Sequence, residues 1–244
     1  LTDVTSGMAV LSIMGPNSRA LLQSLTHTDM SNEAFPFGTS QIIDLGYARV
    51  RASRVTFVGE LGWELYIATE YATGVFDAIV AAGAPFGLKH AGYHALNSLR
   101  MEKGYRHWSH DISPDDTPIE AGLGFTVAYD KPGGFIGREA LLKQKETGVN
   151  KRLVQFALND ASKLLYHNEP IWRNGEIVGH IASGMFGHHI GKSIGMGYVE
   201  NHHGLADKAF ITEGSYEIEV AGERVTASAQ LEPFYDPKSA RVKA

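Results

Sequence analysis

Apolar and polar side chains alternate most clearly in the stretch 54–67. Residues 54–58 are β-branched and aromatic, which predicts a strand. Gly59 and Gly62 follow and predict a tight turn, because glycine adopts positive φ without a steric penalty. A second strand is predicted over residues 63–67, so the stretch as a whole predicts a β-hairpin.

Alternation along the second predicted strand places Glu64 and Tyr66 on one face and Trp63, Leu65 and Ile67 on the other. A carboxylate in an otherwise apolar strand is costly to bury unless a group pairs with it. Two interpretations are open. Glu64 is a surface residue on the solvated face of an antiparallel sheet, or it faces an arginine or a ligand.

The rest of the first half mixes strand and helix patterns. Tyr71, Val75 and Ile79 recur at helical spacing, and Gly83 ends that segment. The sequence therefore predicts an α+β fold, with an antiparallel sheet covered by helices on one face. The predicted strands are 5–14, 41–47 and 48–58, and the predicted helices are 17–25, 70–82 and 91–105.

Beyond residue 148 the helical patterns fade and short strands separated by turns take over. Asn174-Gly175 suits a two-residue type I′ turn and predicts a hairpin over residues 171–178. Strands at this spacing predict a small barrel or a sandwich. We therefore expect two domains, 1–147 and 148–244. The other elements predicted are a strand over 123–129, a short helix over 137–145, and strands over 152–158, 181–184, 195–199, 209–212, 216–220 and 223–229.

The composition of the chain excludes several classes of function. The 244 residues carry a net charge of −5, and no cluster of basic residues predicts nucleic-acid binding. The chain has no cysteine, so disulfides, thiolate catalysis and thiolate metal sites are excluded. No apolar run approaches the roughly 20 residues of a membrane helix. The chain begins at Leu1 without a methionine, which suggests a piece of a longer protein.

Several motifs occur in one order along the chain: 59–65 (Gly-Glu-Leu-Gly-Trp-Glu-Leu), 99–105, 116–123, 195–199 and 232–237. Together they resemble the folate-dependent aminomethyltransferase family, the T-protein of the glycine cleavage system. Trp63 and residues 103–111 look closer to the C-terminal folate module of sarcosine and dimethylglycine dehydrogenases. The resemblance covers essentially the whole chain. It implies α+β lobes around a folate cavity, followed by a C-terminal β-barrel, with the N-terminal part of the module missing here.

The resemblance also implies site residues. Glu64 matches the family glutamate that grips the pterin of tetrahydrofolate, and a carboxylate can accept two parallel hydrogen bonds from such an edge. Phe57 stands where the family usually has tyrosine, so stacking is retained without the hydroxyl. Tyr105 matches a tyrosine beside the folate, and Arg241 falls near a side chain that reaches the cavity. Leu96 replaces a family arginine.

The family's catalytic aspartate lies upstream of Leu1, so we assign no catalytic residue within this chain. The implied function is a tetrahydrofolate-dependent one-carbon-transfer module of a sarcosine or dimethylglycine dehydrogenase-like enzyme. Its partners would be folate, a small N-methyl amine, and a flavin (FAD) dehydrogenase domain, separate or upstream, in the bacterial cytoplasm or mitochondrial matrix. Two alternatives are a stand-alone glycine cleavage aminomethyltransferase and a non-catalytic folate-binding or scaffold domain.

Other polar residues are predicted to have structural roles. Arg100 and Glu102 lie two apart on a helix and do not face each other, so we expect Arg100 to form an ion pair elsewhere in the core. His107, His110 and Asp111 could form a metal cluster, but their spacing favours hydrogen bonds within a loop.

Overall fold

The computed structural model describes residues 1–244, which separate into two compact units. The first consists of residues 1–96 and 238–244, and the second of residues 97–237. The expected domain boundary near residue 148 lies inside the second unit and remains a prediction.

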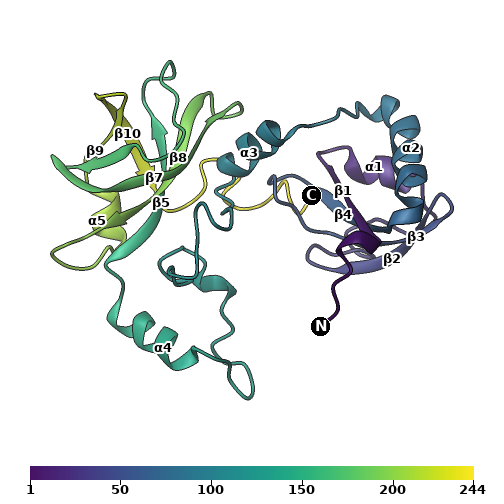
Figure 1. The fold of residues 1–244 in the computed structure, drawn as a ribbon, viewed down its shortest axis with the longest axis horizontal. Helices are drawn as coiled ribbons and strands as arrows, with labels where there is room; N and C mark the ends of the chain where they lie inside the picture. Colours follow the sequence, from purple (N-terminus) through teal and green to yellow (C-terminus); the bar gives the residue numbers. More distant parts are fainter. The chain divides into compact units, whose positions relative to one another are not determined.

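The first unit contains a four-stranded antiparallel sheet in the order β1-β4-β3-β2. Its strands are β1 (Met8–Met14), β2 (Ser40–Leu45), β3 (Ala48–Ser53) and β4 (Gly62–Ala68). Figure 1 shows helices α1 (Ser18–Gln23) and α2 (Ala72–Gly83) on the same side of this sheet. Short 3₁₀ helices lie at Thr5–Gly7, Thr69–Tyr71 and Ala84–Phe86.

The core of the first unit lies between the sheet and the two helices. Trp63, Leu65 and Ile67 of β4 are fully buried and share a hydrophobic cluster with Leu22 of α1 and Ile79 of α2. Alternate residues of β4 point to the opposite face, which neither α1 nor α2 covers. The predicted alternation of β4 and the helices on one face are therefore confirmed.

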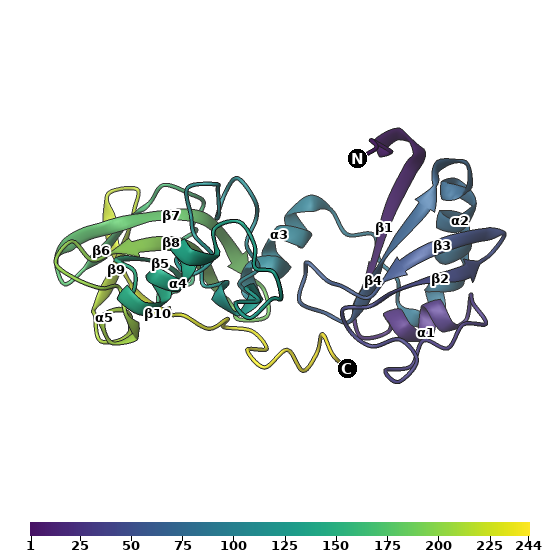
Figure 2. The ribbon, with the colours of Figure 1, turned by 90° about the horizontal axis from the view of Figure 1, so that it is seen from below.

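The second unit is built around a closed barrel in the strand order β10-β5-β8-β7-β6-β9, which Figure 2 shows from below. Closure satisfies both edges of the sheet, so no strand is left unpaired. Helix α3 carries the chain into this unit. The elements are α3 (Tyr93–Glu102), a 3₁₀ helix at Gly124–Thr126, α4 (Arg138–Thr147), β5 (Lys151–Leu158), β6 (Pro170–Arg173), β7 (Glu176–Gly187), β8 (Lys192–Glu200), α5 (Lys208–Thr212), β9 (Tyr216–Val220) and β10 (Glu223–Gln230).

The predicted turn between β6 and β7 is confirmed. Asn174 and Gly175 both have positive φ, at 51° and 91°, as a type I′ turn requires. The predicted barrel is likewise confirmed, and the sandwich that the strand spacing left open is not formed.

Three predicted strands are wrong. β3 ends at Ser53, so residues 54–58 form a loop. Residues 123–129 form a turn around the 3₁₀ helix at Gly124–Thr126. Residues 209–212 belong to α5, because the Asp207 carboxylate caps that helix by accepting the Phe210 N–H at 2.8 Å. None of the helices within residues 1–244 has the length and apolar character that a membrane-spanning helix needs.

Candidate functional site

Glu64 projects from the face of the β1-β4-β3-β2 sheet that lies opposite the helices. Its cross-strand neighbours on this face are Ser12 of β1 and Ser53 of β3. The side chain is half-buried, and its Oε2 atom accepts a hydrogen bond of 2.7 Å from the Tyr66 hydroxyl two residues along the strand. This bond to Glu64, together with burial, raises the pKa of Tyr66. The Tyr66 hydroxyl thus fixes the orientation of the carboxylate.

The carboxylate keeps most of its hydrogen-bonding capacity. A carboxylate offers about four lone-pair sites, and the Tyr66 hydroxyl occupies one of them. Glu64 forms no ion pair with any lysine or arginine, so the arginine partner considered from the sequence is not present. Glu64 is consequently an anionic acceptor held in one orientation on an otherwise small and polar part of the sheet.

Phe57 lies in the loop between β3 and β4, where the sequence predicted a strand. This loop departs from the sheet because Arg54 is 1% exposed and donates to main-chain oxygens, Phe35 O at 2.8 Å and Ala244 O at 3.1 Å. The Arg54 guanidinium also lies 5.6 Å from the centre of the Trp63 ring. Hydrogen bonds from a side chain to distant carbonyls leave no signal in local strand propensity, which explains the wrong prediction.

The turn before β4 differs from the prediction at one glycine. Gly59 has a positive φ of 75°, as expected. Gly62 instead begins β4 opposite Met14, where an added Cβ would lie 2.4 Å from the main-chain oxygen of Ile13. Glycine is therefore needed at position 62 because the backbone of β1 passes too close for a Cβ atom, and not because the position requires a positive φ.

Arg241 lies in the C-terminal segment 238–244, which belongs to the first unit. Val242 anchors this segment with a buried side chain, and the Ala244 carbonyl accepts hydrogen bonds from Arg19 and Arg54. Arg241 itself is exposed. Glu64, Phe57 and Arg241 thus occur in the first unit, whereas Tyr105 belongs to the second, and their common role in binding folate remains a prediction.

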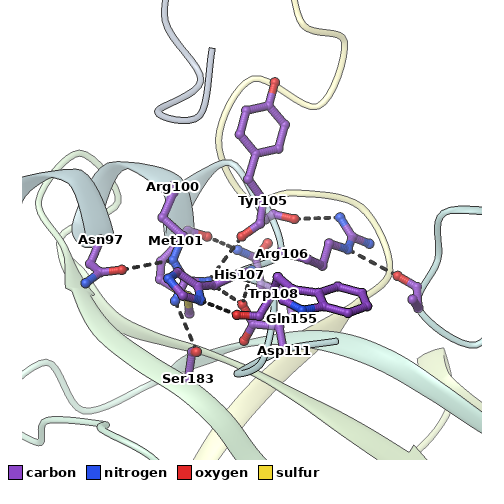
Figure 3. Close-up of polar contacts among 12 residues, drawn as sticks. Asn97, Arg100, Met101, Tyr105, Arg106, His107, Trp108, Asp111, Gln155 and Ser183 are labelled. Atoms are coloured by element: carbon purple, nitrogen blue, oxygen red, sulfur yellow. Dashed lines mark hydrogen bonds and ion pairs between the residues drawn. The ribbon is translucent and has the colours of Figure 1, made fainter. Parts of the chain in front are cut away.

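Tyr105 begins a loop of the second unit that a buried ion pair holds in place (Figure 3). Arg100 Nη1 lies 2.5 Å from Asp111 Oδ2, and both side chains are almost fully buried. The predicted core ion pair of Arg100 is therefore confirmed. Arg100 Nη1 also donates to the carbonyl oxygen of Tyr105 at 3.1 Å, and Asp111 Oδ2 accepts the His107 N–H at 2.7 Å.

The same guanidinium connects three parts of the second unit. Its Nη2 donates to Ser183 Oγ on β7 at 3.1 Å, and its Nε donates to Asn97 on its own helix at 3.2 Å. Figure 3 shows the Tyr105 ring pointing away from this network, which therefore holds the backbone of Tyr105 and not its ring. Burial, followed by the charge of Asp236, raises the pKa of Tyr105, so its phenol is a hydrogen-bonding group at neutral pH.

The neighbouring acidic residue, Glu102, was not predicted to have a role. Its side chain is 2% exposed, and its Oε1 atom accepts the main-chain N–H groups of His189 at 2.7 Å and Ile190 at 2.9 Å. It therefore holds the β7–β8 turn against the end of α3. The sequence did contain a signal for this role. Arg100 and Glu102 are two charged residues near the end of a buried helix that do not face each other, so each needs a partner of its own.

No group of three or more histidine, aspartate or glutamate side chains in the chain could hold a metal ion. The Asp111 carboxylate is engaged with Arg100, and the rings of His107 and His110 contact each other edge to face, with centroids 4.7 Å apart. The main-chain N–H of His107 donates to the Asp111 carboxylate, so these residues hold parts of the loop together.

The protein families and the solved structure that are similar to this chain agree with the fold described above. A family model described as "GCVT N-terminal domain" matches residues 1–131, and one described as "Glycine cleavage T-protein C-terminal barrel domain" matches residues 151–236. The crystal structure of glycine cleavage system aminomethyltransferase T from Bartonella henselae is similar with a TM-score of 0.78 and 22% identity, covering 94% of this chain and 60% of that one.

Curated relatives are longer proteins. Mitochondrial sarcosine dehydrogenase from Homo sapiens is 45% identical over 244 residues, covering 100% of this chain and 26% of its own length. The 4-methylaminobutanoate oxidase (formaldehyde-forming) from Paenarthrobacter nicotinovorans is 42% identical over 241 residues, covering 99% of this chain and 28% of its own length. The chain thus spans about a quarter of these two relatives, and it belongs to the glycine cleavage T-protein family.

Proposed function

We propose that this chain is the tetrahydrofolate-binding, one-carbon-transfer module of an enzyme similar to sarcosine or dimethylglycine dehydrogenase. The observation that carries the proposal is the position of Glu64. It is an oriented carboxylate on the uncovered face of the sheet, where its remaining lone pairs can accept two parallel N–H donors. The 2-aminopyrimidine-like edge of a pterin presents such a pair of donors.

The chain's own residues would bind and orient the folate. Glu64 would accept the pterin donors, Phe57 and Tyr105 would flank the ring, and Arg241 would contact the anionic part of the molecule. Bound tetrahydrofolate would supply an acceptor for the one-carbon unit. The module would accelerate the transfer mainly by holding the acceptor and the carbon donor close together. Loss of an orienting contact should therefore slow the transfer strongly.

The flavin chemistry would belong to a different part of the enzyme. The two relatives named above are a dehydrogenase and an oxidase of which this chain covers about a quarter. A flavin domain, in the same polypeptide or in a partner, would oxidise the N-methyl amine. This module would then receive the carbon released. The family's catalytic aspartate would be contributed from outside residues 1–244.

Titration calorimetry with tetrahydrofolate tests the proposal on this chain and on the full-length protein. We expect Glu64→Gln to weaken binding at least about 10-fold, since glutamine is uncharged and can accept only one of the two hydrogen bonds. Glu70→Gln is the matched control, because Glu70 is an exposed glutamate in the 3₁₀ helix that follows the same strand. We expect it to bind folate as the wild type does.

Two results would overturn the proposal. Equal affinities of Glu64→Gln and wild type would show that Glu64 does not contact the pterin. Absence of folate binding by the full-length protein would favour the non-catalytic scaffold instead.

A further inference from the structure

A cavity of about 490 Å³ lies within the second unit, between the turn at residues 124–129, the end of α4 and residues 205–207. This volume is in the range of pockets that hold small organic molecules. None of the residues predicted to bind folate lines it. Its apolar walls are formed by Ile119, Phe125, Val127, Tyr129, Val149 and Leu205.

The polar lining is dominated by a guanidinium that lacks a partner. Arg152, on β5, is half-buried, and its Nε–H group is inaccessible to water yet donates no hydrogen bond within the protein. The side chain forms no ion pair. Removing such a group from water without compensation is unfavourable. By contrast, the buried Arg100 has Asp111, Ser183 and Asn97 as partners.

A second cation lines the same cavity. The Lys145 ammonium lies 4.6 Å from the centre of the Tyr129 ring and forms no ion pair with a carboxylate. The one acidic side chain in the lining, Asp207, caps α5 through its bond to the Phe210 N–H. The cavity therefore combines apolar walls with two positive charges and one carboxylate that is already engaged in the fold.

We propose that this cavity binds a small organic anion, a carboxylate attached to a flat apolar body. The carboxylate accepts hydrogen bonds from the Arg152 guanidinium, which is suited to planar, bidentate recognition. The apolar body packs between Phe125 and Leu205. Phe125 is 84% exposed, a high value for a phenylalanine, and a ligand covering it would remove that surface from water.

The proposal is tested by titrating the full chain with 2-naphthoate and, separately, with the neutral isostere 2-naphthamide. We expect 2-naphthoate to bind at least about 10-fold more tightly than the amide, because only the carboxylate neutralises the charge of the Arg152 guanidinium while accepting its hydrogen bonds. Arg152→Gln should weaken 2-naphthoate binding at least about 10-fold. Lys143→Gln is the control, since Lys143 is exposed on α4 outside the cavity. This variant should bind 2-naphthoate with the affinity of the wild type.

A second variant keeps the test valid if Arg152→Gln fails to fold. Phe125→Ala removes an exposed ring, so it should fold normally and bind 2-naphthoate several-fold more weakly. Glu64→Gln should bind 2-naphthoate with wild-type affinity, which separates this site from the proposed folate site. The proposal is overturned if 2-naphthoate does not bind, if the amide binds equally well, or if Phe125→Ala and a folded Arg152→Gln both bind as the wild type does.

Discussion

Replacing Asp111 with alanine should destabilise the second unit by about 3–5 kcal/mol, because it leaves the Arg100 guanidinium charged, buried and without its acid. The two side chains are 0% and 4% exposed, so water cannot take the place of the lost carboxylate. The hydrogen-bond count leads to a similar value. Asp111 Oδ2 accepts two N–H donors, from Arg100 at 2.5 Å and from His107 at 2.7 Å, and bonds to a charged group contribute about 1.5–3 kcal/mol each.

Urea unfolding followed by tryptophan fluorescence measures this loss. Trp63 reports on the first unit, while Trp108 and Trp172 report on the second, so the data should be fitted as two transitions. The transition of the second unit should move to lower urea, and that of the first should not move.

Asp44→Ala provides the control. Asp44 and Arg49 lie 3.9 Å apart with both side chains more than four-fifths exposed, so their ion pair should contribute less than about 1 kcal/mol. If Asp111→Ala lowers the free energy of unfolding by no more than Asp44→Ala does, the Arg100–Asp111 ion pair does not hold the Tyr105 loop in place. A further check is the double variant Arg100→Met with Asp111→Leu, which should lose less stability than the sum of the two single changes.

Three further changes test other contacts. Gly62→Ala should destabilise the first unit by about 1–3 kcal/mol, since its Cβ would lie 2.4 Å from the main-chain oxygen of Ile13, and a urea midpoint close to that of the wild type would contradict this. Burial alone would raise the pKa of Asp116, but hydrogen bonds from Lys151 and Ser113 lower it overall. The stabilisation from Asp116 should thus be present above pH 4 and lost as the pH falls through its lowered folded-state pKa, so wild type and Asp116→Asn should converge in thermal melts at low pH. Glu102→Ala should expose the β7–β8 turn to faster amide exchange, because two buried N–H groups lose their acceptor.

Local patterns in the sequence predicted the features that depend on neighbouring residues. The alternation in β4 placed Glu64 and Tyr66 on the uncovered face, and Asn174-Gly175 located a hairpin turn, because each effect acts over a few residues. The helix α5 could also have been predicted, since Asp207 stands immediately before it as a cap.

Contacts between distant segments were not predictable in this way. The β-branched run after Arg54 resembles a strand, yet Arg54 is held by the carbonyl oxygens of Phe35 and Ala244, which lie 19 and 190 residues away. Likewise, a core partner was expected for Arg100, but its identity as Asp111 depends on how the loop after α3 folds back. The cavity at Arg152 arises from three separate segments and leaves no signal in any one of them.

The division of the chain into units has a topological consequence. The second unit is one uninterrupted segment, residues 97–237, inserted into the sequence of the first, which is completed only by residues 238–244. The barrel unit can therefore be produced as a single polypeptide, whereas the sheet unit is assembled from two segments that the whole of residues 97–237 separates in the sequence. Deleting residues 238–244 should accordingly destabilise a unit whose other residues all precede the insertion in the sequence, by depriving Arg19 and Arg54 of the carbonyl they share.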